Sequence, residues 1–413
     1  MLLESALPGR WRFRLRGTRR WDRIALMVCA VLALTVGLLS RQDTAQHLWG
    51  VTAAGGYFFA ALIAARSSVA WARGPAVTAV VGSAVLPLVR LTMINKAQME
   101  VGVVERGARL LLSAGSPYQE TPHGVRDFNP YLPGMSLFGI PHALFGDRLW
   151  TSARWWLVLG FLVVLFSAGR LIKKRGSKTA GHRAPALWVL WLTACPLVAL
   201  PLAIGGVDPT VVALLCLGFT FAHLGLAGRA GLVLGAAAAL KWTAWPALPV
   251  VIAFLAARGG RRHAMNCFVG AAGFSLAAVV PFILIGPQGF LENVVLYPFG
   301  LSDTPSTAAS PLPGYLIATS FPHGKSITVA LLTLAAVTIG ISLLWRPPQN
   351  VIAATDRLTL GLAIAIILAP ASRVGYAIYP ILLLAWPRLL LLQSIKPRSP
   401  GKKDTDRPLS QRL

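Results

Sequence analysis

Long apolar runs alternate along the chain with short polar or basic interruptions. About 20 apolar residues in a helix cross the roughly 30 Å hydrocarbon core of a bilayer, so these runs predict membrane-spanning helices. They lie at about 24–40, 47–65, 76–93, 152–169, 185–204, 210–226, 264–285, 326–345, 358–369 and 376–392. Together with the segment 231–257, they predict an all-α polytopic membrane protein with about twelve transmembrane segments.

The segment 231–257 permits two interpretations. As a single span it would place Arg258, Arg261 and Arg262 outside, away from the other basic clusters. Two short helices that meet at KWTAWP, residues 241–246, would keep these arginines inside. Each helix would be only about 17 Å long and would need protein or a wet cavity around it at membrane depth. We favour the pair of short helices.

The longest polar interruption runs from residue 94 to residue 150 and begins with an amphipathic pattern. Its apolar positions recur at helical spacing, with charged residues between them, and predict a helix over 96–113 that lies in the outer membrane interface. Gly115 and Pro117 are expected to end it. The apolar positions are Val101, Val104, Ala108 and Leu111.

Charge placement predicts the orientation in the membrane. Lys and Arg gather in the tails 1–23 and 395–413 and in an internal cluster over 170–183. Because such clusters mark the cytoplasmic side, both termini are expected to be cytoplasmic and the loops 94–150 and 286–325 extracytoplasmic. Nine of the fourteen acidic residues then fall in predicted outer segments, namely Asp43, Glu100, Glu105, Glu120, Asp127, Asp147, Asp208, Glu292 and Asp303.

Composition agrees with a membrane protein. Of 413 residues, 55% are hydrophobic and 13% are charged, whereas soluble domains carry about 25% charged residues. The net charge of +25 is distributed as topology signals, which argues against a nucleic-acid partner. The four cysteines lie in apolar runs without paired spacing, so neither a disulfide nor a metal site is indicated. We also predict no essential divalent metal and no cofactor.

Glu100 is the first candidate for chemistry, since it stands at the start of the predicted amphipathic helix. It either complements the helix N-terminus or acts as a general base at the membrane surface. Glu105 is the alternative base; five residues further on, it lies roughly 140° around the helix and faces another direction. Asp208 is interpreted as a turn or helix cap, with a functional alternative.

Cations near the predicted outer surface could bind a phosphate. Arg373 is either a snorkelling arginine or a bidentate phosphate ligand. Lys241 lies at the KWTAWP break, where a buried lysine would be costly without an anion. Arg90 is a further candidate, and His323 and Lys325 are weaker ones.

The loop resembles the first outer loop of GT-C superfamily glycosyltransferases, and more narrowly that of actinobacterial mannosyltransferases that use polyprenyl-phosphate-mannose. The matching residues there are Glu100, Val103, Ala108, Leu111, Gly115, Pro117 and Tyr118, followed by FNPYLP at 128–133. Similar segments are GGVDP at 205–209 and those at 230–246, 286–301 and 369–380. Two features depart from the family: Glu100 replaces the usual Asp, and two spans at 24–75 precede the region 76–394 that would form the catalytic domain.

The resemblance implies transfer of a hexose, mannose, from a polyprenyl-phosphate donor to a glycolipid or cell-envelope glycan, in the plasma membrane and on its extracytoplasmic side. It favours Glu100 as the base, and direct displacement would invert the anomeric centre. The candidates for binding the sugar or acceptor are Tyr118, Asn129, Tyr131, Asp208, Tyr376 and Tyr379. The alternative functions are a twelve-span secondary transporter or flippase, which would favour midplane sites and repeated halves, and a non-catalytic scaffold subunit.

Overall fold

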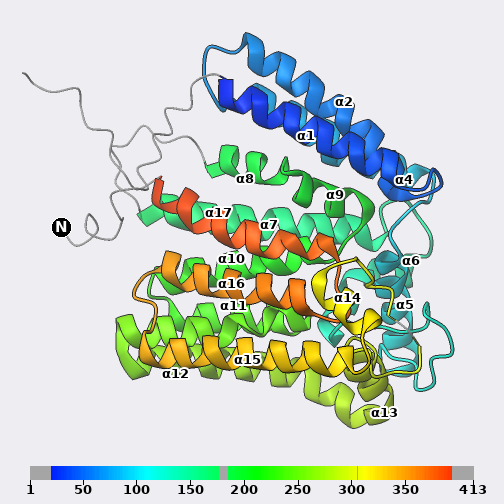
Figure 1. Cartoon of the computed structure of the whole chain (residues 1–413), viewed down its shortest axis with the longest axis vertical. Coiled ribbons are helices and arrows are strands. Elements are labelled where there is room, and N and C mark those ends of the chain that lie inside the picture. Colours follow the sequence, from blue (N-terminus) through cyan, green and yellow to red (C-terminus); the bar gives the residue numbers. More distant parts are fainter. Residues whose placement is uncertain (1–19, 176–184, 305, 393–413) are drawn as a thin grey trace, which may run out of the picture.

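The computed structural model describes residues 20–175, 185–304 and 306–392. Within these ranges the chain is helical, and its only β pairing is an isolated bridge between Ala309 and Ser372. The predicted all-α class is thereby confirmed. Most long helices run side by side, and the short helices α5, α6, α13 and α14 gather at one end of the bundle (Figure 1). Most residues of the tails predicted to be cytoplasmic lie outside the described ranges.

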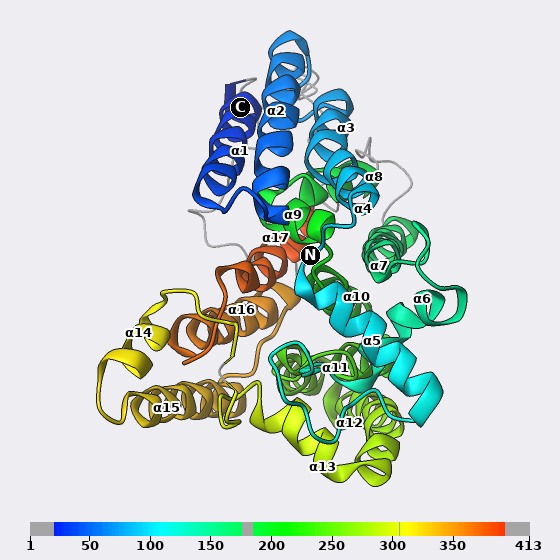
Figure 2. The same ribbon diagram turned by 90° about the vertical axis from the view of Figure 1, so that its right-hand side faces the viewer.

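The N-terminal helices form a layer on one side of the bundle (Figures 1 and 2). Trp49 Nε1 donates a hydrogen bond to the carbonyl of Ser83, and Tyr57 OH donates one to the carbonyl of Ala194. These contacts attach the two predicted N-terminal spans to the helices that follow. The layer comprises α1 (Arg20–Leu39), α2 (Ala45–Arg66), α3 (Arg73–Val80), the π-helical turn η1 (Val81–Val85) and α4 (Leu86–Met93).

The middle of the chain forms α7 (Ala153–Arg175), α8 (Pro185–Thr193), α9 (Pro196–Ile204) and α10 (Asp208–His223). The sequence predicted one span over 185–204, but the structure bends it by 77° between α8 and α9. The cause is Pro196, since a residue before proline avoids the helical region, and Cys195 is extended. Almost every residue of α10 is buried, so this helix forms the centre of the bundle.

The ambiguous segment folds as two helices that meet at KWTAWP, as favoured from the sequence. α11 (Ala227–Ala238) leads into the 3-10 turn η3 (Trp242–Ala244) and then α12 (Ala247–Ile285). Gly260 interrupts α12 with non-helical angles. Arg258 Nη1 donates a hydrogen bond to the carbonyl of His223, and Ser275 Oγ donates one to the carbonyl of Gly235. The part of α12 before Gly260 therefore runs to the end of the bundle where α10 ends. The part after Gly260 returns beside α11.

The last part of the chain adds α13 (Pro287–Phe290), the π-helical turn η4 (Leu291–Leu296), α14 (Pro313–Ser320), α15 (Gly324–Trp345), α16 (Val351–Leu368), the 3-10 turn η5 (Val374–Ala377) and α17 (Ile378–Leu392). Among the described residues, seven helical stretches are long and apolar enough to cross a membrane, or eight if the bent pair counts as one. The predicted count of about twelve is therefore not confirmed. Several predicted spans are short, and α12 counts as one stretch although it folds at Gly260.

The polar loop 94–150 forms α5 (Met99–Ala114), the 3-10 helix η2 (Pro133–Gly139) and α6 (Ile140–Phe145). α5 confirms the predicted amphipathic helix, and it ends at Gly115, whose φ of 73° is left-handed. End-on, α5 lies across the ends of the long helices (Figure 2). This position brings the first turn of α5 close to residues from several helices.

Candidate active site

The Glu100 carboxylate is buried in the first turn of α5, and only 6% of the residue is exposed. Its Oε1 atom accepts hydrogen bonds from Gln98 Nε2 at 3.2 Å and from Arg373 Nη1 at 2.9 Å. Its Oε2 atom accepts one from the backbone N–H of Val207 at 3.2 Å. The two oxygens thus have different surroundings: side chains hold Oε1, and the backbone holds Oε2.

Arg373 reaches Glu100 from the turn between α16 and η5. Its Nη2 atom donates a hydrogen bond to Thr307 Oγ1 at 2.7 Å. The backbone N–H of Ser310 donates to the carbonyl of Ser372 at 3.0 Å, which fixes the turn against residues 307–310. One quarter of the Arg373 side chain remains exposed. Because a guanidinium carries five N–H donors, this group has capacity for a further anion.

The local environment raises the proton affinity of Glu100. Burial raises its pKa above the ordinary value of 4.5, and the Asp208 carboxylate adds to the rise. The positive charges of Lys241 and Arg373 lower it, but the net shift is upward. A carboxylate whose pKa lies closer to neutral pH is a better general base than an ordinary exposed one.

A second ion pair is buried beside Glu100. Lys241 Nζ lies 2.6 Å from Asp208 Oδ1, and each side chain is 10% exposed. Tyr379 OH donates to the same Asp208 oxygen at 2.7 Å, and Thr243 Oγ1 donates to Tyr379 OH at 2.7 Å. Burial is the largest single influence on the pKa of Lys241 and lowers it, but Asp208, Tyr376 and Glu100 together raise the pKa by more, so the net shift is upward.

Aromatic rings cover the remaining sides of this lysine. Lys241 Nζ lies 4.7 Å from the ring centre of Tyr376 and 5.6 Å from that of Tyr131. Both distances suit cation–π attraction. The ammonium thus already has a carboxylate and two aromatic faces as partners, which makes Arg373 the more accessible cation.

Backbone hydrogen bonds hold the loop over these residues. The N–H of Gln98 donates to the carbonyl of Ile204 at 2.9 Å, and the N–H of Leu132 donates to that of Leu240 at 3.1 Å. The first bond places the start of α5 beside the end of α9. The second places Tyr131 beside Lys241. Four separate parts of the chain, near residues 100, 208, 241 and 373, therefore meet at one end of the bundle.

Glu105, the alternative base, lies elsewhere on α5. Its Oε1 atom accepts hydrogen bonds from the backbone N–H of Ala153 at 2.9 Å and from Ser152 Oγ at 3.1 Å. His142 Nε2 is 3.9 Å from Oε2. The carboxylate satisfies the N-terminus of α7, which is a structural arrangement. Glu105 thus has different partners from Glu100, and the choice of Glu100 as the base stays a prediction.

Two of the predicted sugar ligands make hydrogen bonds within and beside the loop. Tyr118 OH donates to the carbonyl of Tyr131 at 2.9 Å. Asn129 Nδ2 donates to the carbonyl of Pro117 at 3.1 Å, and its backbone N–H donates to Asn293 Oδ1 at 2.8 Å. Both residues are buried, and their polar atoms contact the protein. These bonds stabilise the loop, and sugar binding by the two residues stays a prediction.

Three predicted phosphate ligands do not contact the Glu100–Arg373 pair. Arg90 is exposed, and its Nη1 donates to Thr52 Oγ1 at 3.3 Å. His323 precedes α15 with a left-handed φ of 61°, and Lys325 follows in its first turn; both are exposed.

Asp208 lies in the first turn of α10, but its side chain bonds Lys241 and Tyr379 and makes no capping hydrogen bond.

Several contributing residues were not predicted as site residues. Gln98 and the Val207 N–H hold Glu100, Thr307 holds Arg373, and Thr243 holds Tyr379. Val207 belongs to GGVDP and Thr243 to KWTAWP, so two of them lie within segments that the sequence had already singled out. Nothing in the pattern around Thr307 marks it.

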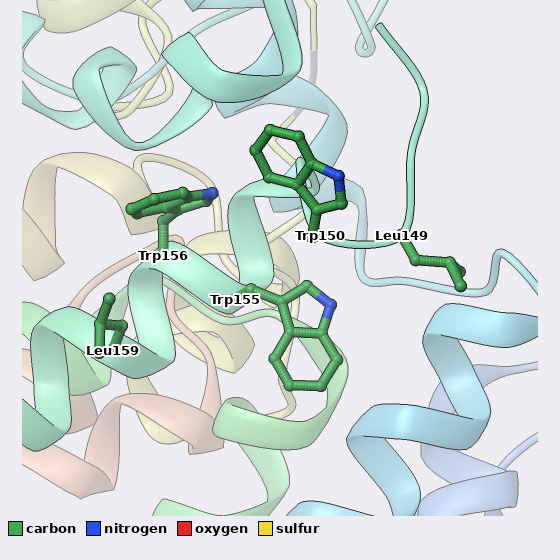
Figure 3. Close-up of a pocket in the computed structure, with 5 residues that line it drawn as sticks. All are labelled: Leu149, Trp150, Trp155, Trp156 and Leu159. Atoms are coloured by element: carbon green, nitrogen blue, oxygen red, sulfur yellow. The ribbon is translucent and has the colours of Figure 1, made fainter. Parts of the chain in front are cut away.

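Two pockets lie near this end of the described structure. One, of about 430 Å³, is lined by the apolar residues Leu149, Trp150, Trp155, Trp156 and Leu159 (Figure 3). Such a tryptophan cluster is typical of the interface between membrane and water. The other, of about 550 Å³, is lined mainly by polar side chains and includes Arg373. It therefore reaches Arg373 and Gln98, the two side chains that donate hydrogen bonds to Glu100.

Within the described ranges, no group of three or more His, Cys, Asp or Glu side chains is arranged to hold a metal ion. The expectation that no divalent metal is essential stays a prediction. The groups that the site does offer are a buried carboxylate, a partly exposed guanidinium and a buried lysine–aspartate pair. A carboxylate can accept a proton from a hydroxyl, and a guanidinium can stabilise a departing phosphate.

Comparison with known proteins identifies one family. Residues 129–385 match the family model of glycosyltransferase family 87. This range contains Asp208, Lys241 and Arg373 and excludes Glu100. The search of curated proteins and the search of solved structures found no significant match.

Proposed function

The chain belongs to glycosyltransferase family 87, and we propose that it transfers a hexose from a lipid-linked donor to a hydroxyl group of an acceptor. The donor is a polyprenyl-phosphate-linked hexose, mannose by the sequence resemblance. The acceptor is a hydroxyl of a glycolipid or cell-envelope glycan. Membrane lipid, donor and acceptor are thus its partners. The apolar helices fit a multi-pass membrane protein, which would meet lipid-linked substrates within the bilayer.

The observation that carries this proposal is the contact between the Glu100 carboxylate and the Arg373 guanidinium at 2.9 Å. In the proposed step, an acceptor hydroxyl attacks the anomeric carbon while Glu100 takes its proton. The bond from that carbon to the phosphate oxygen breaks, and its electron pair leaves with the phosphate, whose charge Arg373 stabilises. The phosphate is a weak base and needs no second carboxylic acid. A single displacement inverts the anomeric centre.

The second ion pair supports this arrangement. The Lys241 ammonium is buried between Asp208 and the rings of Tyr131 and Tyr376. It contributes positive potential at the place where phosphate charge would develop, without being the group that binds it. The two tyrosine rings offer flat apolar surfaces to a sugar ring. Tyr379 fixes the orientation of the Asp208 carboxylate.

We place the site on the extracytoplasmic face of the plasma membrane. Asp208 begins α10 at the end that carries Glu100, and His223 ends it where Arg258 binds. Arg261 and Arg262 lie beside Arg258 in sequence. Basic residues near membrane helices are retained in the cytoplasm, so the Glu100 end is the outer one. The ionisable groups of the site gather at this end, and no observation favours a transporter.

The test is transfer of labelled mannose from polyprenyl-phosphate-mannose to a membrane glycolipid extract by the purified full-length protein. Glu100→Gln should reduce transfer by at least about 100-fold, because a positioned base contributes about 10²–10⁴-fold. Glu120→Gln, an exposed acid in the same loop, is the matched control. Full turnover by a folded Glu100→Gln variant would disprove the assigned base, and no transfer by the unmodified protein would disprove the donor.

A further inference from the structure

The polar pocket beside Arg373 joins the N-terminal helices to the active site. Its lining includes side chains from the α1–α2 turn, from the α4–α5 connection and from the α16–η5 turn. Six of its polar side chains are those of Asp43, Gln46, Asn95, Lys96, Gln98 and Arg373. Its volume, about 550 Å³, lies within the range of about 300–1,000 Å³ that is usual for small-molecule sites.

The position of the pocket relative to Glu100 indicates which substrate it receives. Gln98 and Arg373 line the pocket, and both donate to the same carboxylate oxygen, Oε1. Val207, which bonds Oε2, is not part of the lining. A hydroxyl that reaches Oε1 would therefore come from the pocket. A general base must lie within hydrogen-bonding distance of the hydroxyl that it deprotonates.

The chemistry of the lining suits a polyhydroxyl ligand. Gln46 and Asn95 offer amide groups that both donate and accept, and neither side chain makes a hydrogen bond within the described residues. Lys96 donates and forms no ion pair there, while Asp43 accepts. Sugar hydroxyls need both kinds of partner. The amide oxygens of Gln46 and Asn95 and the Asp43 carboxylate need hydrogen-bond donors, which sugar hydroxyls supply and an ionised phosphate does not.

We propose that this pocket binds the sugar headgroup of the glycosyl acceptor. The inference rests on the proposed function and deepens it. Five of the six named lining residues, all except Arg373, precede the range 129–385 that matches the family. The two N-terminal spans thus have a function. The turn between α1 and α2, together with the first residues of α2, forms one wall of the acceptor site. Gln46 contributes to acceptor selection.

Kinetics of the purified full-length protein test the proposal. Polyprenyl-phosphate-mannose is the donor, and a glycolipid extract of the source membranes is the acceptor. Gln46→Leu removes the amide, and Gln46→Trp fills the pocket. Each should raise the amount of extract needed for half-maximal rate at least fivefold and leave the donor KM unchanged. Gln42→Leu, an exposed glutamine outside the pocket, should change neither value. A raised donor KM, or unchanged half-saturation, would overturn the proposal.

A second measurement does not depend on turnover. In Gln46→Cys, labelling by a membrane-impermeant maleimide should slow at least threefold when the glycolipid extract is added. The same extract with its sugar headgroups removed by acid hydrolysis should give no protection. Gln42→Cys should be labelled at the same rate in both. Protection by both extracts, or by neither, would contradict headgroup binding, even if the unmodified protein proves inactive with the mannose donor.

Discussion

Glu100 Oε1 lies 2.9 Å from Arg373 Nη1, although the two residues are 273 positions apart in the chain. The contact joins the first turn of α5 to the turn that follows α16. It keeps the carboxylate oriented and leaves part of the guanidinium accessible. The group proposed to accept the proton and the group proposed to bind the phosphate are therefore in direct contact before substrate arrives.

The fork of Arg373 is the basis of the first prediction. Its Nη1 and Nη2 atoms bond Glu100 and Thr307 separately. Arg373→Gln should lower kcat by about 10²–10³-fold, because it removes the charge that stabilises the leaving phosphate. Arg373→Lys keeps the charge but lacks the planar fork, so its loss should be smaller but clear. Initial rates at saturating donor measure both variants.

The control for these variants is Arg388→Lys. Arg388 also pairs with a carboxylate, that of Asp356, at 2.8 Å, but it is exposed and does not contact the proposed site. Its replacement should leave kcat within about twofold, since exposed ion pairs contribute little. Equal losses in Arg373→Lys and Arg388→Lys would show a general effect of arginine removal and would refute the assigned phosphate role.

Local patterns in the sequence predicted much of the fold. The 3.6-residue spacing of Val101, Val104 and Ala108 predicted α5, and Gly115 predicted its end. The basic residues after 257 favoured the break at KWTAWP. The bend between α8 and α9 was missed, although Pro196 was a visible signal within an apolar run. Helix breaks that fall inside apolar runs are easily overlooked, because hydropathy averages over them.

Pairing within the site could not be predicted from such patterns. Asp208 and Lys241 are 33 positions apart, and nothing in the sequence shows that they form an ion pair at 2.6 Å. That contact depends on how α10, α11 and α17 dock, which places Tyr379 on the same oxygen. Tyr118 has the residue type of a sugar ligand but bonds the loop backbone. Residue type therefore suggests a role, and packing decides whether the side chain can perform it.

The pH dependence of transfer follows from the upward shift in the pKa of Glu100. A general base must be ionised, so kcat/KM should fall on acidification as Glu100 becomes protonated. Because burial raises the pKa, the acid-side inflection should lie above the ordinary 4.5. A pH profile of kcat/KM between about 4 and 8 measures it. A kcat/KM value that stays constant down to pH 4.5 would contradict the role of Glu100 as the general base.

The buried Asp208–Lys241 pair yields a prediction about stability. Asp208→Asn leaves the Lys241 ammonium buried without a counter-charge, which should cost about 3–5 kcal/mol. The double variant Asp208→Asn, Lys241→Met removes both charges and should lose less than the two single changes together. Thermal unfolding of the purified protein in detergent measures each loss. Strictly additive losses would show that the two groups do not stabilise one another.

Metal removal tests the source of positive charge in the site. We expect transfer to persist within about twofold after dialysis against EDTA and with EDTA in the assay, because Arg373 provides the charge opposite the leaving phosphate. Arg373→Gln in the presence of Mg²⁺ is the complementary arm, and Mg²⁺ should not restore its rate. A loss in EDTA that Mg²⁺ or Mn²⁺ reverses would show that a divalent metal takes part.

Gly205 links backbone geometry to the position of Glu100. Its φ is 91°, and a Cβ atom there would collide with Val101, the neighbour of Glu100 on α5. Gly205→Ala should therefore displace the first turn of α5 and lower kcat at least tenfold. Gly225→Ala is a matched control, since Gly225 has a φ of 75° but no atom within 4 Å of the added Cβ. Both variants carry a strain of about 1–3 kcal/mol, so their thermal stabilities should fall, but only Gly205→Ala should lose activity in protein that remains folded. Equal kcat values in the two variants would show that the contact with Val101 does not position the base.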